Sequence, residues 1–309
     1  MNFQGKKQKK RVLVTGTSGM LGKDIFFELV NNDYIVFGVD LKNNPILPEQ
    51  FQKIGDLTEK NFTLSVLEKI KPDIIIHCAA VVNLETCQNN KLLAHTVHVD
   101  VTNWLAQFKP NDTKLIYIST DSVFDGEKGN YKETDKPHPL NYYAISKLDG
   151  EQMAKLNPNH IIIRTNIFGF DNPLRGSLSE WAIKNFQKNT PIQGFTDVIF
   201  NAIYTKHLAK IILSLVKSDF RGLINVASKN IVSKYEFLSI LINQMGVSQS
   251  LISKSLSSEV SFAISRPLIT NLDIQQIQQL TTIPTIEEGI KEMVKDFNKL
   301  NRTDQNETN

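Results

Sequence analysis

The chain has 309 residues, of which 41% are hydrophobic and 22% charged, which suits one large α/β domain or two intertwined ones. The net charge of +3 is small, and basic residues gather in one run between Lys6 and Arg11, so we expect a flexible leader over residues 1–10 and no nucleic-acid partner. The cysteines and histidines show no disulfide or metal-ligand spacing, and no uncharged apolar run approaches about 20 residues. We therefore predict a reduced, cytoplasmic protein with no metal site and no membrane partner.

In the first half of the chain, short apolar runs alternate with segments that carry apolar residues at helical spacing. We predict strands at residues 11–16, 34–40, 51–57, 73–80, 114–120 and 160–166. Helices are predicted at 20–31 and at about 89–108, and a further helix holds Tyr143 between the last two strands. Continuous apolar strands between amphipathic helices form a parallel sheet covered on both faces, so the predicted fold class is α/β, a Rossmann-type doubly wound sheet.

After residue 166 the alternation loosens. Helices are predicted at about 177–188, 205–217, 233–245 and 285–299, with a short strand at 222–227. We expect residues 11–170 to form the Rossmann domain, with a segment at about 195–230 returning to it. Residues 171–299 should form most of a smaller mixed α/β lobe, and residues 300–309 a polar tail.

A glycine cluster, VTGTSGMLGK at residues 14–23, follows the first strand and opens the first helix. In a dinucleotide-binding loop Gly16 permits the tight turn, Gly19 lets backbone N–H groups approach a pyrophosphate, and Gly22 allows close packing of helix on strand. The helix start adds aligned N–H donors, so Ser18, Met20 and Leu21 belong to the predicted phosphate site.

Asp40 ends the second strand 18 positions after Gly22 and is predicted to accept hydrogen bonds from the adenosine ribose. A carboxylate there repels a 2′-phosphate and favours NAD(H), whereas the nearby Lys42 relaxes that preference, so NAD and NADP both stay open. Asp56 and Leu57, after the third strand, are expected beside the adenine.

Thr120 ends a predicted strand, and after a loop Tyr143 and Lys147 share one helical face in the sequence YAISK. With the glycine spacing, this order resembles the extended short-chain dehydrogenase/reductase superfamily. Hydride addition to a ketone leaves an alkoxide, which needs an acid within about 3 Å. A tyrosine, with an ordinary pKa of about 10, would be made more acidic by the ammonium of Lys147, which also reaches the nicotinamide ribose. Thr120 would donate a hydrogen bond to the carbonyl oxygen.

Three longer stretches resemble the dTDP-4-dehydrorhamnose reductase group: STDSVFDG (119–126), PLNYYAISKLDGE (139–151) and SRPLITNLD (265–273). The resemblance covers about residues 11–295. It implies an NAD(P)H-dependent reductase of a nucleotide-linked 4-keto-6-deoxy sugar in deoxysugar and polysaccharide biosynthesis, and a homodimer as a family-level expectation. Ala79 and Ala80, in HCAA, match a loop that lies along the cofactor in related sugar-nucleotide epimerases.

Substrate contacts are predicted at two positions of these stretches. Asn141 directly precedes the catalytic helix, and Arg266 carries a guanidinium fork that suits a pyrophosphate.

The chain departs from the group's pattern at two informative positions. His98 stands where the group has an asparagine that supports a proton-relay water, and both a relay and a packed core histidine are open for it. Ser122 replaces a tyrosine that lines the sugar pocket. These changes leave the redox residues intact and leave the sugar's identity open.

Three other functions are compatible with parts of this pattern. A related dehydratase needs Thr-Asp-Glu, and Ser122 stands where the glutamate belongs, which disfavours elimination of water. An NAD-dependent 4-epimerase uses the same Thr, Tyr and Lys and stays open. A non-catalytic NADP-binding regulatory subunit, like that of methionine adenosyltransferase, also stays open, because fold does not fix function.

Overall fold

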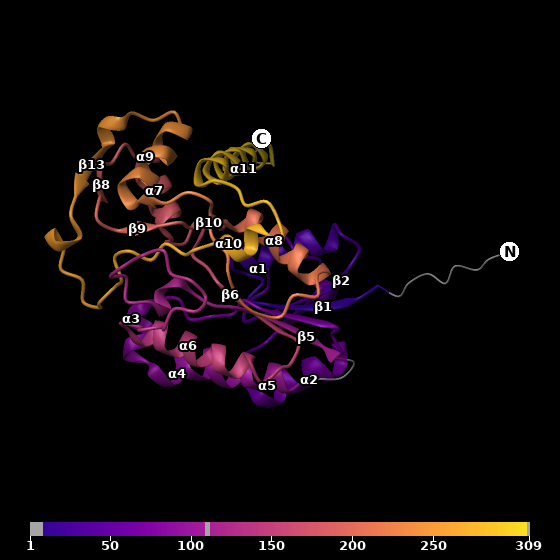
Figure 1. Cartoon of the computed structure of the whole chain (residues 1–309). Helices are drawn as coiled ribbons and strands as arrows, with labels where there is room; N and C mark the ends of the chain where they lie inside the picture. The colour runs from indigo at the N-terminus through magenta and orange to yellow at the C-terminus, as the bar shows by residue number, and fades with distance from the viewer. Residues whose placement is uncertain (1–8, 109–111, 308–309) are drawn as a thin grey trace.

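The computed structural model of the protein describes residues 9–108 and 112–307, with side chains as far as residue 300. The predicted leader falls on residues 1–10, and its first eight residues lie outside this part of the chain. A central sheet lies between two layers of helices, and a smaller lobe sits above one end of it (Figure 1). Within the described residues no helix is both long enough and apolar enough to cross a bilayer.

The central sheet has seven strands in the order β11-β6-β5-β4-β1-β2-β3, and every pairing is parallel. The strands are β1 (Arg11–Thr15), β2 (Ile35–Asp40), β3 (Gln52–Ile54), β4 (Ile74–His77), β5 (Lys114–Ile118), β6 (His160–Arg164) and β11 (Gly222–Asn225). The direction of winding reverses between β1 and β4, so the loops that follow these strands lie side by side at the carboxyl edge. The predicted doubly wound α/β fold is thereby confirmed, with a third strand shorter than expected.

Strand side chains alternate between two buried clusters. On β6, Ile161 and Ile163 join the cluster beneath α1 and α8, whereas Ile162 joins the cluster on the opposite face. Successive strand residues point to opposite faces, so a strand covered on both sides must be apolar throughout. This is why the β-branched runs show no alternation with polar residues.

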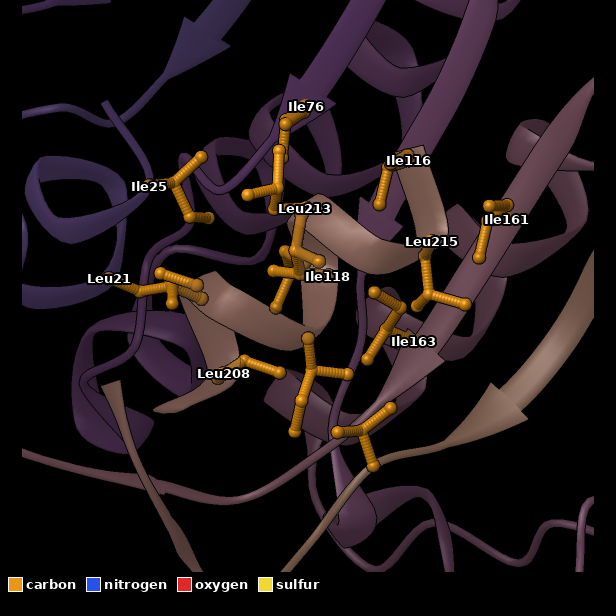
Figure 2. Packing of buried hydrophobic residues seen from close by; sticks show 14 of the residues in the cluster. Leu21, Ile25, Ile76, Ile116, Ile118, Ile161, Ile163, Leu208, Leu213 and Leu215 are labelled. Atoms are coloured by element: carbon orange, nitrogen blue, oxygen red, sulfur yellow. The ribbon is translucent and has the colours of Figure 1, made fainter. Parts of the chain in front are cut away.

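Helices cover both faces of the sheet. One face carries α1 (Met20–Val30) and α8 (Thr205–Lys217). Figure 2 shows how Leu208, Leu213 and Leu215 of α8 pack toward the isoleucines of β4, β5 and β6. The other face carries α2 (Lys60–Ile70), α5 (Val101–Gln107) and α6 (Tyr142–Ala154), which lie together below the sheet in Figure 1.

The helix predicted over 89–108 is interrupted. It divides into the end of α3 (Leu84–Asn89), α4 (Lys91–His95), a π-helical turn (Thr96–Asp100) and α5. Asn90 causes the first break, since its side-chain oxygen accepts the N–H of Leu93 and starts a new helix. π-helical turns often occur at functional sites, and this one carries His98.

The smaller lobe is assembled from short strand pairs and three helices. The pairs are β7 (Ile167–Phe168) with β10 (Ile203–Tyr204), β9 (Ile199–Phe200) with β12 (Val232–Ser233), and β8 (Ile192–Phe195) with β13 (Ile252–Ser255). The helices are α7 (Leu178–Gln187), α9 (Lys234–Gln244) and α11 (Ile286–Glu307). Helix α11 continues to Glu307, so the tail predicted at 300–309 is helical as far as that residue.

Segments cross between the two parts of the molecule in both directions. Helix α8 and strand β11 pack with the central sheet, and so do Leu272, Ile277 and Ile283 around α10 (Gln275–Gln278). The later segments therefore hold the lobe against the sheet instead of forming an independent unit.

Packing of α8 on the sheet should dominate the stability of the Rossmann domain. Leu208 is fully buried there, so Leu208→Ala should lower the free energy of unfolding by about 2–5 kcal/mol through lost burial and a residual cavity. Urea denaturation measures this change. Leu92→Ala is the matched control, because Leu92 is 77% exposed and its truncation should cost less than about 0.5 kcal/mol. Equal losses in the two variants would contradict the assignment of the core.

Candidate active site

The glycine loop between β1 and α1 makes two close backbone approaches that only glycine allows. Gly16 has φ +73°, and a Cβ there would lie 2.8 Å from the backbone nitrogen of Ala79. A Cβ on Gly22 would clash with the carbonyl oxygen of Gly16, so helix and loop approach closely only without one. Gly19 is the N-cap residue of α1 and offers no side-chain cap, and the first turn of the helix has no acidic residue, which leaves its N-terminus suited to an anion.

Asp40, at the end of β2, shapes this loop directly. One of its carboxylate oxygens accepts the N–H of Ser18 at 2.7 Å, and the other accepts the N–H of Leu41 at 2.7 Å. Asn44 adds a second tie, since its amide donates to the carbonyl oxygen of Thr17 at 2.9 Å. A carboxylate oxygen has more than one lone pair, so Asp40 can hold the loop and still accept a ribose hydroxyl.

The other predicted cofactor residues lie along the same edge of the sheet. Ala79 and Ala80 follow β4, and the hydroxyl of Thr15 accepts the N–H groups of Cys78 and Ala79 at 3.2 and 3.1 Å. Thr15, which the sequence analysis did not single out, thus holds the loop after β4 beside the glycine loop. After β3, Leu57 is buried, whereas Asp56 is exposed and accepts the N–H of Thr58 at 2.8 Å.

The structure brings Thr120, Tyr143 and Lys147 together at the carboxyl end of β5. The Thr120 hydroxyl lies near the phenol of Tyr143, on the first turn of α6. One turn further along α6, the Lys147 ammonium donates to the carbonyl oxygen of Ile118 at 2.6 Å and lies 4.1 Å from the centre of the Tyr117 ring. Thr120 and Lys147 are both buried, and Tyr143 is partly so.

Burial is the largest influence on the pKa values of Tyr143 and Lys147. It raises the pKa of Tyr143 to about 12, and the nearby Thr120 hydroxyl offsets this only in part. It lowers the pKa of Lys147 to about 7, although Glu151 and Cys78 act in the opposite direction. Lys147 is not among the groups that shift the pKa of Tyr143 here, and its ammonium binds a backbone carbonyl of β5. The phenol is a protonated group at neutral pH.

His98 is completely buried and joins two parts of the site. Its Nε2 accepts the N–H of Val81 at 3.0 Å, so the proton of the neutral ring sits on Nδ1, which is 2.9 Å from the Ser146 hydroxyl. Ser146 in turn donates to the carbonyl oxygen of Tyr143 at 3.0 Å. Burial lowers the pKa of His98 to about 2, with Lys147 acting in the same direction, so the ring stays neutral. The structure thus shows His98 as a packed, hydrogen-bonded histidine.

A buried ion pair fixes α6 against β6. Arg164 donates from Nε and Nη2 to the two carboxylate oxygens of Glu151 at 2.9 and 2.8 Å, and the side chains are 4% and 0% exposed. Ser119 donates to the same carboxylate at 2.6 Å. The sequence analysis did not assign these residues, although Glu151 closes the quoted stretch at 139–151. The contact between Glu151 and Arg164 arises only when α6 packs against the end of β6.

A cavity of about 1120 Å³ opens beside the hydroxyl groups, between the sheet edge and the lobe. Asp121 and Ser122, which directly follow Thr120, line it, and so do Asn141 and Arg266. Asn141 caps α6 by accepting the N–H of Ala144 at 3.0 Å, and it donates to the carbonyl oxygen of Ser265 at 3.0 Å. The cavity wall also includes Lys234 and the 40% exposed Trp181, neither of which carried a recognisable signal in the sequence.

Comparison with known proteins gives the family. Residues 10–299 match the model of the RmlD substrate binding domain family. The chain belongs to this family. It is 29% identical over 287 residues to the dTDP-4-dehydrorhamnose reductase of Aggregatibacter actinomycetemcomitans, with 87% of this chain and 92% of that protein covered. It is 26% identical over 291 residues to methionine adenosyltransferase 2 subunit beta of Danio rerio, covering 88% and 85%.

Solved structures agree with this assignment. The dTDP-4-dehydrorhamnose reductase of Bacillus anthracis, in complex with NADP, is 26% identical, with a TM-score of 0.83 over 94% of this chain and all of that one (100%). The predicted relationship to dTDP-4-dehydrorhamnose reductases is thereby confirmed, and with it the NAD(P)-dependent oxidoreductase class. The match to the methionine adenosyltransferase subunit is not better than the match to the reductases.

The ion pair between Glu151 and Arg164 should be essential for stability. Glu151→Gln leaves a buried guanidinium without its carboxylate, and the free energy of unfolding should fall by about 3–5 kcal/mol. Glu127→Gln is the control, because Glu127 is exposed and should contribute less than about 0.5 kcal/mol. Chemical denaturation of both variants measures the contrast, and similar stabilities would contradict it.

Lys147 should make stability depend on pH in a defined window. Its folded pKa of about 7 lies below the ordinary value of 10.5, so between these values the unfolded chain binds a proton that the folded chain has lost. The free energy of unfolding therefore increases as the pH rises, by up to about 1.4 kcal/mol per pH unit. The free energy of unfolding of the wild type, minus that of Lys147→Met, should therefore increase from about pH 7.5 to 9.5. If this difference in the free energy of unfolding does not change with pH, the pKa of Lys147 is not lowered in the folded protein.

Proposed function

We propose that this protein is an NAD(P)H-dependent reductase of a nucleotide-linked 4-keto-6-deoxy sugar, in deoxysugar and polysaccharide biosynthesis. The observation that carries the proposal is the placement of Thr120 beside Tyr143 at the carboxyl end of β5. The glycine loop follows β1 at the same edge of the sheet, and Asp121 and Ser122, next to Thr120, line a cavity large enough for a nucleotide sugar. When bound, the nicotinamide supplies a hydride to the carbonyl carbon.

The residues of the chain would handle the carbonyl oxygen and its proton. Tyr143 is protonated at neutral pH and would give its proton to the oxygen as negative charge develops there. Thr120 would donate a hydrogen bond to the same oxygen. Lys147 would hold the nicotinamide ribose, and its ammonium would stabilise the tyrosinate that remains.

The remaining cofactor contacts follow from the loop geometry. Gly16, Ser18, Gly19, Met20, Leu21 and Gly22 would surround the pyrophosphate. Asp40 would accept hydrogen bonds from the adenosine ribose, Asp56 and Leu57 would lie beside the adenine, and Ala79 and Ala80 would lie along the cofactor. The carboxylate of Asp40 favours NADH over NADPH, and comparison of the two KM values tests this preference.

Asn141 and Arg266 would contact the substrate, since both line the cavity. We further expect the protein to act in the cytoplasm and to form a homodimer, which sedimentation analysis would measure.

Tyr143→Phe tests the chemical role. The variant keeps the ring but lacks the acid, so turnover should fall by roughly two to four powers of ten. Binding of NADPH, followed by fluorescence, should survive. Near-normal turnover would remove Tyr143 from the mechanism.

Incubation with NADH or NADPH and a set of 4-keto-6-deoxy nucleotide sugars distinguishes the candidate functions. Stoichiometric oxidation of the nicotinamide supports the reductase. Isomerisation without net oxidation of a retained NAD would indicate the epimerase. The 26% identity with a methionine adenosyltransferase subunit favours one further candidate, a regulatory protein, which would bind the dinucleotide without turnover.

A further inference from the structure

A segment of the smaller lobe reaches the glycine loop. Residues 169–177 connect β7 with α7, and the side chain of Arg175 extends from this segment to the loop between β1 and α1 (Figure 1 shows α7 and α1). Its Nη2 donates to the carbonyl oxygen of Ser18 at 2.9 Å. Lys23, in the first turn of α1, adds a second tie, since its ammonium donates to the carbonyl oxygen of Phe170 at 3.4 Å. The lobe therefore places a guanidinium at the predicted phosphate loop.

The backbone of Arg175 is fixed by α7. Glu180, which is 1% exposed, accepts the N–H of Arg175 at 3.0 Å and three further N–H groups of the same segment. Lys184 donates to the carbonyl oxygen of Arg175 at 3.1 Å. Because hydrogen bonds to a charged carboxylate are strong, the segment has little freedom, and the Arg175 side chain starts from a defined point.

The guanidinium of Arg175 has unused donors. Its Nε lies 3.4 Å from a carboxylate oxygen of Asp171, and within the described part of the chain its Nη1 has no hydrogen-bond partner. An arginine carries five N–H donors, and this side chain is 60% exposed. A single exposed ion pair contributes little to stability, so the fold alone does not account for an arginine at this position. Its free donors can bind an anionic oxygen of a ligand.

Ser18 lies between this guanidinium and the carboxylate of Asp40. Asp40 accepts the Ser18 N–H at 2.7 Å, and Arg175 donates to the Ser18 carbonyl oxygen. One residue separates the two contacts, so covalent geometry keeps the guanidinium within about 9 Å of the Asp40 carboxylate. In the proposed cofactor site Asp40 marks the place of the adenosine ribose, whose 2′ position carries the phosphate that distinguishes NADP from NAD. The lobe can therefore supply the positive charge that a 2′-phosphate needs.

We propose that Arg175 is a specificity residue for the cofactor, which binds the 2′-phosphate of NADP and offsets the repulsion between that phosphate and Asp40. This rests on the NAD(P) site of the proposed function, which it extends by naming a lobe residue that decides between the two dinucleotides. A planar guanidinium suits phosphate because it donates two parallel hydrogen bonds. Lys42, which the sequence suggests for this role, is exposed, whereas Arg175 is already hydrogen-bonded to the glycine loop.

Binding of adenosine 2′,5′-bisphosphate and of 5′-AMP to the purified full chain, measured by isothermal titration calorimetry, tests the proposal. The two ligands differ only in the 2′-phosphate. Arg175→Gln should raise the Kd of the bisphosphate roughly tenfold, the effect of one charged hydrogen bond, and leave that of 5′-AMP unchanged. Arg175→Lys keeps the charge and should retain part of the affinity. Arg221→Gln is the matched control, because Arg221 is an exposed arginine directly before β11, at the opposite edge of the sheet.

The outcomes separate this proposal from the proposed function. If 4-keto sugars are reduced but Arg175→Gln binds the bisphosphate as tightly as the wild type, the role of Arg175 is wrong and the reductase stands. If no keto sugar is reduced but the variant selectively loses the bisphosphate, the role stands and the reductase fails.

Two further results would overturn the role of Arg175. One is an equal loss of affinity for both ligands, because Arg175 would then support the loop or the 5′-phosphate instead of the 2′-phosphate. The other is wild-type binding of 5′-AMP that is as tight as that of the bisphosphate. Circular dichroism and thermal melts confirm that each variant is folded.

Discussion

The attachment of α6 to the carboxyl ends of β5 and β6 is the constraint on which the whole site depends. Glu151 binds Arg164 of β6 through two hydrogen bonds and also accepts from Ser119, while Lys147 donates to Ile118 of β5. These contacts lie one helical turn apart and fix both the rotation and the height of α6 on the sheet. Thr120 and Tyr143 meet because of that placement, since one follows the strand and the other begins the helix. Burial of an ion pair carries a desolvation penalty, and here the pair specifies how α6 is placed on the sheet.

Hydrogen bonds between uncharged groups connect α6 to the loop that follows β4. His98 lies in a π-helical turn, accepts the N–H of Val81 and reaches Ser146 in α6. The departure from the reductase group therefore retains hydrogen bonding at this point of the fold, in a form that stays uncharged because the surroundings are buried.

The two halves of the site have different origins. The redox half consists of strand ends, the N-terminus of α1 and helix α6, held by hydrogen bonds and close glycine contacts. The cavity half combines α7, α9 and the loop after β13, with aromatic rings, aliphatic side chains and the cations Lys234 and Arg266. In the proposed reductase, the reacting groups would lie on the sheet edge, and the substrate would be recognised by lobe segments whose composition can change without disturbing that edge.

The sequence by itself determined the doubly wound sheet, because apolar strands buried on both faces and glycines at a turn leave few alternatives. It also determined which residues could act at a carbonyl, since Thr120 and the Tyr143/Lys147 pair lie in local motifs. Only the tertiary structure decided what surrounds them. Burial, which no local pattern specifies, moves the pKa of Tyr143 upward and that of Lys147 downward. Glu151 and its partners are separated in the chain, as are Lys234 and Arg266, which line one cavity, and such neighbours are brought together only once the elements have packed.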